Sequence, residues 1–354
     1  MNQPLPDVRK ILALRPNAVG DFAYALPALH ALKAAYPDAE LVFVGKQWHA
    51  EFLHARPGPI DRVVVIPPVA GVGEPPDAVV DPDPVERFVA AMRALRFDLA
   101  VQMFGGGRYS NPFIMQLGAR LTIGARAANA GPLDRWVRFG AINNRRLELL
   151  EVAALAGAPP AMPERELMVT ERDRAEAAWA LPPAPGQPLV LLQPGASDPR
   201  RRWPAACFAA VADALAQEGA QVAVNGTAAE APLTRAVVAQ MRHPAADLGG
   251  RLSLSCLCGL LERAALLVSN DTGPLHLGLA IGTPCVGIYW LTNLLQAAPL
   301  RQHRHRAALS LRVRCPVCGE QNIATRCPHD ACFVDDVRPA EVTRMALELL
   351  RAGR

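Results

Sequence analysis

The strongest constraint on the fold is an alternation of short apolar runs with helical segments, repeated in both halves of the chain. Four runs of the length of buried strands lie in the first half, at residues 11–14, 41–45, 62–66 and 98–103. Segments with helical spacing of apolar residues lie between them, at 25–36 and 85–95. Strands that alternate with helices form parallel sheets with helices on both faces. The first half is therefore predicted to be an α/β domain.

A proline-rich stretch at 158–188, with a helical segment near 171–180, separates the halves. Dense proline disfavours helix and sheet interiors and is typical of an interdomain connection. The alternation then restarts, with strands predicted at 188–194, 220–226, 265–270 and 284–290 and helices at 204–218, 228–241, 257–265, 274–281 and 340–351. We predict a first domain over 1–165, a linker over 166–187, a second domain over 188–338, and a final helix over 339–354 that packs back towards the first domain. Two such domains facing each other place a ligand cleft at the carboxyl ends of their strands.

Composition excludes several classes of protein. The chain is 51% hydrophobic and 20% charged, which excludes a disordered chain, and no apolar run reaches the length of a membrane-spanning helix, about 18 residues. A net charge of +4 is too weak to indicate nucleic-acid binding but suits anionic substrates or an anionic membrane surface. The N-terminus lacks the apolar segment of a secretory signal. We therefore expect a cytoplasmic protein whose cysteines are thiols or metal ligands.

The turn after the first strand carries Gly20 and Asp21. Glycine permits close backbone approach, and the helix that follows offers N–H groups to an anion. Asp21 either caps this helix or projects into the cleft as a general base, and spacing alone favours the cap. The glycines at 105–107, after the fourth strand, predict a loop. Arg108 in that loop reaches an anion in the cleft or lies in solvent.

The second half carries a run of arginines, Arg200, Arg201 and Arg202, before a helix start at Trp203 and Pro204. Guanidinium groups pair with phosphate through two hydrogen bonds, so the run is either a phosphate clamp or a solvated basic loop.

A second strand–helix turn carries Asp271, Thr272 and Gly273, where backbone N–H groups could hold a pyrophosphate. The segment is neither GxGxxG nor a Walker loop. His276 lies one turn into the helix and is either a structural residue or one that faces the cleft. Glu230, after Gly226, either stabilises a helix N-terminus or accepts hydrogen bonds from a ribose.

Four cysteines cluster near the C-terminus with spacing C-x2-C-x8-C-x4-C, at Cys315, Cys318, Cys327 and Cys332. This pattern predicts a tetrathiolate site for Zn²⁺, with iron as an alternative and His329 able to replace one thiolate. The other possibility is a group of free thiols. We expect any metal here to be structural.

Four segments together resemble glycosyltransferase family 9, the bacterial ADP-heptose:lipopolysaccharide heptosyltransferases and their relatives. They are GDFAYALPALHALKAAYP (20–37), QPGAS with RRWP (193–204), NGTAAE (225–230) and NDTGPLHLGLAIGTP (270–284). The resemblance implies the GT-B fold, with two Rossmann-like domains facing a cleft. It also implies that the first domain holds the acceptor and that the second holds the ADP-sugar. The implied reaction is inverting transfer of a heptose from ADP-heptose to lipopolysaccharide core or a related glycan, with no metal required for catalysis.

The resemblance also assigns roles to residues. Asp21 matches the catalytic base, Glu230 the ribose ligand, and Gly20 and Arg108 are expected on the acceptor side. The expected donor-binding residues are Ser197, Arg201, Arg202, Gly226, Glu230, Asp271, Thr272, Gly273 and His276. Arg201 stands where the family often has lysine, which keeps the charge but changes its geometry.

Two alternatives stay open. The same fold could use another nucleotide sugar or a protein or capsule acceptor, or the chain could bind a nucleotide sugar without catalysis. The presence of Asp21, Glu230, Asp271 and His276 favours an enzyme. The expected partners are an ADP-sugar donor and a lipid-linked or glycan acceptor, with peripheral contact to the inner membrane.

Overall fold

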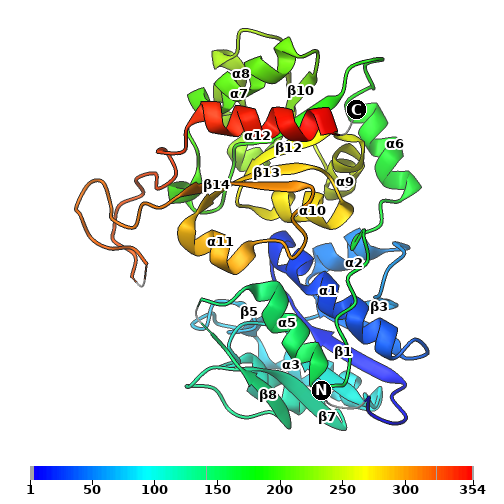
Figure 1. The fold of residues 1–354 in the computed structure, drawn as a ribbon. Helices are drawn as coiled ribbons and strands as arrows, with labels where there is room; N and C mark the ends of the chain where they lie inside the picture. The colour runs from blue at the N-terminus through cyan, green and yellow to red at the C-terminus, as the bar shows by residue number, and fades with distance from the viewer. Residues whose placement is uncertain (1–3, 141, 324, 353–354) are drawn as a thin grey trace. The chain divides into compact units, whose positions relative to one another are not determined.

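The computed structural model describes residues 4–140, 142–323 and 325–352 and divides into two compact units, Met1–Met168 and Val169–Arg354 (Figure 1). The strands of the first sheet are β1 (Lys10–Leu14), β2 (Glu40–Gly45), β3 (Arg62–Val65), β6 (Leu99–Gln102), β7 (Leu121–Arg126) and β8 (Arg135–Arg138). They pair in parallel in the order β3-β2-β1-β6-β7-β8. The helices of this unit are α1 (Val19–Ala35), α2 (Gln47–Leu53), α3 (Pro82–Ala94), α4 (Ser110–Gln116) and α5 (Arg145–Ala154). Two short strands, β4 (Val69–Ala70) and β5 (Gly73–Glu74), pair with each other in the proline-rich segment 67–84.

The second unit repeats this design. Its sheet strands are β9 (Leu189–Gln193), β10 (Gln221–Val224), β11 (Ala246–Asp247), β12 (Leu266–Asn270), β13 (Cys285–Trp290) and β14 (His305–Ser310), in the parallel order β11-β10-β9-β12-β13-β14. Its α-helices are α6 (Glu171–Ala180), α7 (Ala205–Gln217), α8 (Ala231–Gln240), α9 (Leu254–Arg263), α10 (Gly273–Ile281), α11 (Leu291–Ala297) and α12 (Pro339–Ala352). Two single-turn 3₁₀ helices, η1 (Pro199–Arg201) and η2 (Ala228–Glu230), precede α7 and α8.

Each sheet begins in its centre and grows first to one side and then to the other. The strand order therefore reverses between β1 and β6 in one unit and between β9 and β12 in the other. Ligands of open α/β sheets bind outside the carboxyl ends of the strands at such a reversal. This topology confirms the predicted fold class, α/β with two Rossmann-like doubly wound sheets of the GT-B type.

The central strands are buried because helices cover both faces of a parallel sheet. Ile11–Leu14 of β1 and the whole of β9, β12 and β13 are inaccessible to solvent or nearly so. The edge strand β8 alternates between half-buried and exposed residues, so it carries no apolar run and the sequence pattern missed it. Among the described residues, no helix combines the length and the apolar character needed to span a bilayer.

The segment expected to be a linker belongs largely to the second unit. Helix α6 packs against α9, and an added Cβ at Gly259 of α9 would collide with the carbonyl of Asp173. Arg174 of α6 also forms an ion pair with Glu262 of α9 at 2.7 Å. The close approach at Gly259 thus makes α6 part of the second unit, and the division falls after Met168.

The final helix differs from the prediction as well. We expected it to pack towards the first domain, but α12 lies on α7 and on strands β12, β13 and β14 of the second unit, as Figure 1 shows in red. Its buried residues Val342, Ala346, Leu349 and Leu350 join the apolar core of that unit. Burial of this apolar stripe, with charged residues on the opposite side, determines where the helix lies.

Candidate active site

A pocket of about 160 Å³ lies in the first unit at the carboxyl ends of β1 and β6. Its lining residues come from the loops after β1, β6 and β8, from β6 and β7 themselves, and from α1 and α5. They are Arg15, Asn17, Asp21, Gln102, Met103, Gly105, Ala125, Phe139, Arg145, Glu148 and Leu149. The pocket occupies the position where the strand order reverses, and it contains the candidate base.

Asp21 is the third residue of α1, and it does not cap the helix. The N-cap is Ala18, which makes no side-chain hydrogen bond. The Asp21 carboxylate instead accepts a hydrogen bond from Nη2 of Arg15 at 3.2 Å, and its side chain is 40% exposed. The prediction that Asp21 caps this helix is therefore wrong, because the helix begins at Val19, two residues before Asp21. Asp21 presents a carboxylate that is both anchored and open to a ligand.

Arg15 holds the Asp21 carboxylate in place through several hydrogen bonds. Its Nε donates to the carbonyl of Asp21 at 2.6 Å, and Nη1 donates to the carbonyl of Met103. Burial lowers the pKa of Arg15, and the charge of Asp21 opposes this shift. An arginine guanidinium stays protonated in proteins, so Arg15 presents a positive charge to Asp21. Arg15 thus links the loops after β1 and β6 and sets the orientation of Asp21.

Arg145 and Glu148, on the wall formed by α5, were not predicted. They form an ion pair at 3.3 Å, and the Arg145 guanidinium lies 4.7 Å above the centre of the Phe139 ring. Burial raises the pKa of Glu148, although Arg145 and hydrogen bonds oppose the shift. The sequence signal for α5 was Asn144, whose side chain caps the helix by accepting from the N–H groups of Arg146 and Leu147.

Gly20 and Arg108, the two residues expected on the acceptor side, differ in where they lie relative to the pocket. Gly20 lies in the first turn of α1, next to Asp21. Arg108 is exposed and lies over the ring of Tyr109 at 5.1 Å, and it is absent from the described lining of the pocket. From the loop that carries Arg108, the residue that lines the pocket is Gly105.

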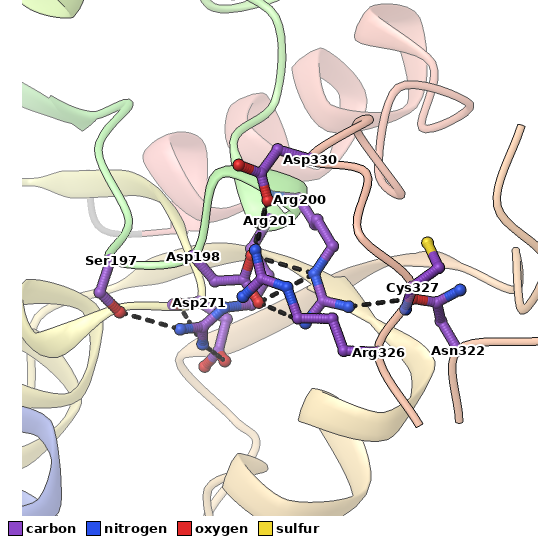
Figure 2. Close-up of polar contacts among 9 residues, drawn as sticks. All are labelled: Ser197, Asp198, Arg200, Arg201, Asp271, Asn322, Arg326, Cys327 and Asp330. Atoms are coloured by element: carbon purple, nitrogen blue, oxygen red, sulfur yellow. Dashed lines mark hydrogen bonds and ion pairs between the residues drawn. The ribbon is translucent and has the colours of Figure 1, made fainter. Parts of the chain in front are cut away.

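In the second unit, charged side chains gather at the carboxyl ends of β9 and β12 (Figure 2). Asp271 directly follows β12, is 2% exposed, and bonds Nη1 of Arg201 at 3.1 Å and Nε2 of His276 at 3.0 Å. Nη2 of Arg201 also donates to Oγ of Ser197 at 3.1 Å. Burial alone would raise the pKa of Asp271, but His276 and Arg201 together hold it below the ordinary value.

His276, expected either as a structural residue or facing the cleft, lies inside the second unit and not on an open surface. It is 2% exposed and bonds Asp271. Helix α10 begins at Gly273 with Thr272 as its N-cap, and the Thr272 side chain makes no capping bond. Pro274 carries no N–H, and the N–H groups of Leu275 and His276 donate to the carbonyl of Thr272 at 3.1 and 3.4 Å. The N–H of Gly273 has no hydrogen bond in the described part of the structure, so this group is left for an anionic ligand.

Glu230 lies beside the loop that follows β9. Its Oε2 accepts hydrogen bonds from the backbone N of Thr227 at 2.9 Å and from Oγ1 of Thr227 at 3.1 Å. An added Cβ at Gly195 would collide with the Glu230 carboxylate, and one at Gly226 would come within 3.2 Å of the Glu230 Cβ. Both glycines thus make room for this side chain.

The three consecutive arginines do not act as a single clamp. Arg200 is buried and bonds Asp198 and Asn322. Nε of Arg202 donates to the carbonyl of Ala196 at 2.9 Å. Arg201 alone of the three has a described bond to the Asp271 turn. Successive residues of a single 3₁₀ turn point in different directions, and this separates their roles.

The cysteine cluster has a different composition from the one expected. The ligand atoms of Cys315, Cys318, Cys327 and His329 lie within 4.8 Å of one another. Sγ of Cys332 instead donates to the carbonyl of Arg202 at 3.0 Å. The prediction that placed Cys332 in the cluster is corrected, because this residue packs against the core of the second unit.

The cluster has two properties of a metal site. Nδ1 of His329 is buried without a hydrogen-bond partner in the described part of the structure. The pKa of Cys327 is lowered to about 6, chiefly because the backbone N–H of His329 donates to its sulfur. A low pKa favours the thiolate, which is the form that binds metal.

Comparison with known proteins agrees with this architecture. Residues 85–322 match the model of glycosyltransferase family 9 (heptosyltransferase). The lipopolysaccharide core heptosyltransferase OpsX of Haemophilus influenzae is 23% identical over 307 residues, which cover 82% of each chain.

Two solved structures share the fold. The ADP-heptose lps heptosyltransferase II of E. coli superposes with a TM-score of 0.74 at 20% identity, covering 97% of this chain and 99% of the other. The iron-containing dodecameric glycosyltransferase TibC of enterotoxigenic E. coli gives a TM-score of 0.57 at 15% identity, covering 99% of this chain and 78% of the other.

Proposed function

The chain belongs to glycosyltransferase family 9, and we propose that it transfers a heptose from ADP-heptose to lipopolysaccharide core or a related glycan acceptor. The observation that carries this proposal is the cluster of Arg201, Asp271 and His276 at the N-terminus of α10. Its position at the reversal of strand order is where nucleotides bind in doubly wound sheets. OpsX and the E. coli enzyme support the choice of sugar and acceptor.

In this proposal the second unit binds the donor. The diphosphate lies against the N–H of Gly273 at the start of α10 and against Arg201, which supply positive charge where the leaving group becomes more negative. Asp271 and His276 hold Arg201 and the turn in place, and Glu230 accepts hydrogen bonds from the ribose. The expected contacts of Ser197, Arg202, Gly226, Thr272 and Gly273 extend this site along the same loops.

The acceptor binds in the pocket of the first unit, where Asp21 acts as the general base. Asp21 takes the proton from an acceptor hydroxyl as its oxygen forms a bond to the anomeric carbon and the bond to the diphosphate breaks. A single displacement of this kind inverts the anomeric centre. Arg15 keeps the carboxylate oriented, and Gly20 permits close approach of the acceptor. Arg108 contacts an anionic part of the acceptor outside the pocket.

We place this reaction in the cytoplasm, with peripheral contact to the inner membrane where a lipid-linked acceptor is found. The formal net charge of +4 favours contact with an anionic surface.

The test is a transfer assay with ADP-heptose and core-type acceptors, read by mass spectrometry of the acceptor. We expect mass gain corresponding to one heptose, and inversion at the anomeric carbon. A parallel series with other nucleotide sugars and with protein or capsule acceptors covers the alternative substrates. Binding of ADP-heptose in calorimetry without transfer to any acceptor would favour a non-catalytic binding protein.

Replacement of Gly195 by alanine tests the nucleotide site without removing a charge. The new methyl group collides with the Glu230 carboxylate, and the flexible end of this side chain can move aside. We expect the fold to survive, with a loss in ADP affinity of about 10-fold, comparable to losing one hydrogen bond to a charged group. Calorimetry with ADP measures this loss, and Glu230→Gln is the companion variant. Because both changes remove the same contact, their effects should not add, and full additivity would contradict the assignment.

We also infer that Cys315, Cys318, Cys327 and His329 hold a structural Zn²⁺. Three thiolates and one imidazole form a four-coordinate set that zinc prefers, and the unpartnered Nδ1 of His329 supports it. Iron is the alternative, because thiolates also bind iron and TibC is an iron-containing relative. The metal would stabilise the segment and take no part in the transfer.

Metal analysis of the purified chain tests this site. We expect about one zinc or iron per chain, loss of the metal in Cys327→Ser, and retention of the metal in Cys332→Ser. The two variants make the same chemical change in cysteines on the same segment. Metal loss in Cys332→Ser with retention in Cys327→Ser would contradict the proposed ligand set.

A further inference from the structure

The loop that carries the arginines is attached to the segment that carries the cysteines. The backbone N of Phe333 donates to the carbonyl of Arg200 at 2.8 Å. Cys332 donates to the carbonyl of Arg202 at 3.0 Å, and Nη1 of Arg200 donates to Oδ1 of Asn322 at 3.1 Å. Any movement of the cysteine segment therefore acts directly on the arginine loop.

The side chain of Arg200 is held from several directions. Nε donates to both oxygens of Asp198 at 3.1 Å, and Nη2 donates to Oδ2 of Asp198 at 2.7 Å. The guanidinium also lies 5.5 Å from the ring centre of Trp290. Only 8% of the residue is exposed, so Arg200 has a structural role and is not available as a ligand for phosphate.

Arg201, the next residue, points the other way (Figure 2). It bonds Asp271 and Ser197, which lie in the proposed donor site. Both arginines belong to η1, whose single turn is closed by a hydrogen bond from the N of Arg201 to the carbonyl of Asp198 at 3.0 Å. Because consecutive Cα atoms are only about 3.8 Å apart, a shift of Arg200 moves Arg201 as well.

Of the three bonds that attach the arginine loop to the cysteine segment, the one that reaches a residue of the cysteine cluster runs through Asn322. Oδ1 of Asn322 accepts from Nη1 of Arg200 at 3.1 Å and from the backbone N of Cys327 at 3.1 Å. Asn322 is 5% exposed, and its own backbone N donates to the carbonyl of Val313 at 2.9 Å. The position of Cys327 and the position of the Arg200 guanidinium are thus set by the same oxygen.

We propose that Arg200 is a positioning residue for the donor site. Through Asn322, Arg200 transmits the order of the segment that carries Cys315, Cys318, Cys327 and His329 to Arg201. Binding of zinc to the cluster then tightens binding of ADP, although the two ligands do not touch. By linkage, ADP tightens zinc by the same factor. This inference rests on the donor and metal sites proposed above.

Calorimetry with ADP on zinc-loaded and chelator-stripped protein tests the coupling. In the wild type we expect stripping to weaken ADP binding by about 10-fold, within the usual range of allosteric coupling. In Arg200→Lys, which keeps the charge but loses the forked bonds, we expect weak ADP binding in both forms and a zinc content unchanged from the wild type. Asn322→Ala should behave in the same way. Gln321→Ala, which shortens an exposed amide on the adjacent residue, is the matched control and should retain the full effect of zinc.

The outcomes separate the proposals. An equal loss of ADP affinity on removal of zinc from the wild type and from Arg200→Lys overturns the role of Arg200. A wild type whose ADP affinity is the same with and without zinc overturns it as well. Failure of the zinc-loaded wild type to bind ADP overturns the donor site itself, and failure to take up zinc overturns the metal site. Zinc content measured on every sample identifies which of these has occurred.

Discussion

Replacement of Asp21 by asparagine should abolish sugar transfer while leaving ADP binding intact. The amide keeps the size of the side chain and its hydrogen bond to Arg15, but it cannot accept the proton of the acceptor hydroxyl. Loss of a general base lowers turnover by about 10²- to 10⁴-fold. Steady-state kinetics measures the fall in kcat, and calorimetry measures ADP affinity, which in the proposed function depends on residues of the second unit.

The matched control is Asp38→Asn, an exposed carboxylate in the turn after α1. We expect it to retain wild-type turnover. Turnover by the Asp21 variant within a few-fold of the wild type would end the assignment of the base. A loss of ADP affinity equal to the loss of turnover would instead indicate general damage to the protein.

The second large effect is expected for Asp271→Asn, as a loss of both stability and ADP binding. Asp271 is 2% exposed, forms an ion pair with Arg201 at 3.1 Å and bonds His276, so the variant leaves the charge of Arg201 without its buried counter-charge. Removal of one partner of a buried ion pair costs about 3–5 kcal/mol. Urea denaturation followed by tryptophan fluorescence measures the change in unfolding free energy of the second unit.

The lowered pKa of Asp271 predicts that the stability of the protein depends on pH. The folded-state pKa of Asp271 lies below its ordinary value of 3.8, so its stabilisation is complete above that value. The stabilisation disappears as the pH falls through the folded-state pKa. The wild type should therefore lose stability below about pH 4 through this group, and Asp271→Asn should lack that part of the loss.

Glu218→Gln provides the control for Asp271. Glu218 forms an exposed ion pair with Arg351 at 3.2 Å, and such pairs contribute less than about 1 kcal/mol. A destabilisation by Asp271→Asn no larger than that of Glu218→Gln would contradict the importance of the buried cluster.

Much of the fold was predictable because its signals are local. Apolar runs of four to six residues identified β1, β2, β9, β12 and β13, which are buried on both faces. Polar residues directly after such strands, Asp271 among them, indicated the carboxyl edge of the sheet, where ligands of open α/β sheets bind. The strand β8 and helix α5 escaped prediction because an edge strand and a helix with charged residues in its first turns carry weak apolar patterns.

The side-chain partners depended on the tertiary structure. Arg201 and Asp271 are 70 residues apart, and Arg200 and Asn322 are 122 apart, so strand order brings each pair together. The cysteine spacing likewise could not separate His329 from Cys332, because the direction of a side chain in a loop depends on what packs beneath it. Local patterns along the chain were therefore enough to predict the fold class, the edge of each sheet that carries the polar residues and the family. Contacts between distant segments settle which arginine bonds the Asp271 turn and which side chains form the Cys/His cluster, since no local pattern connects these segments.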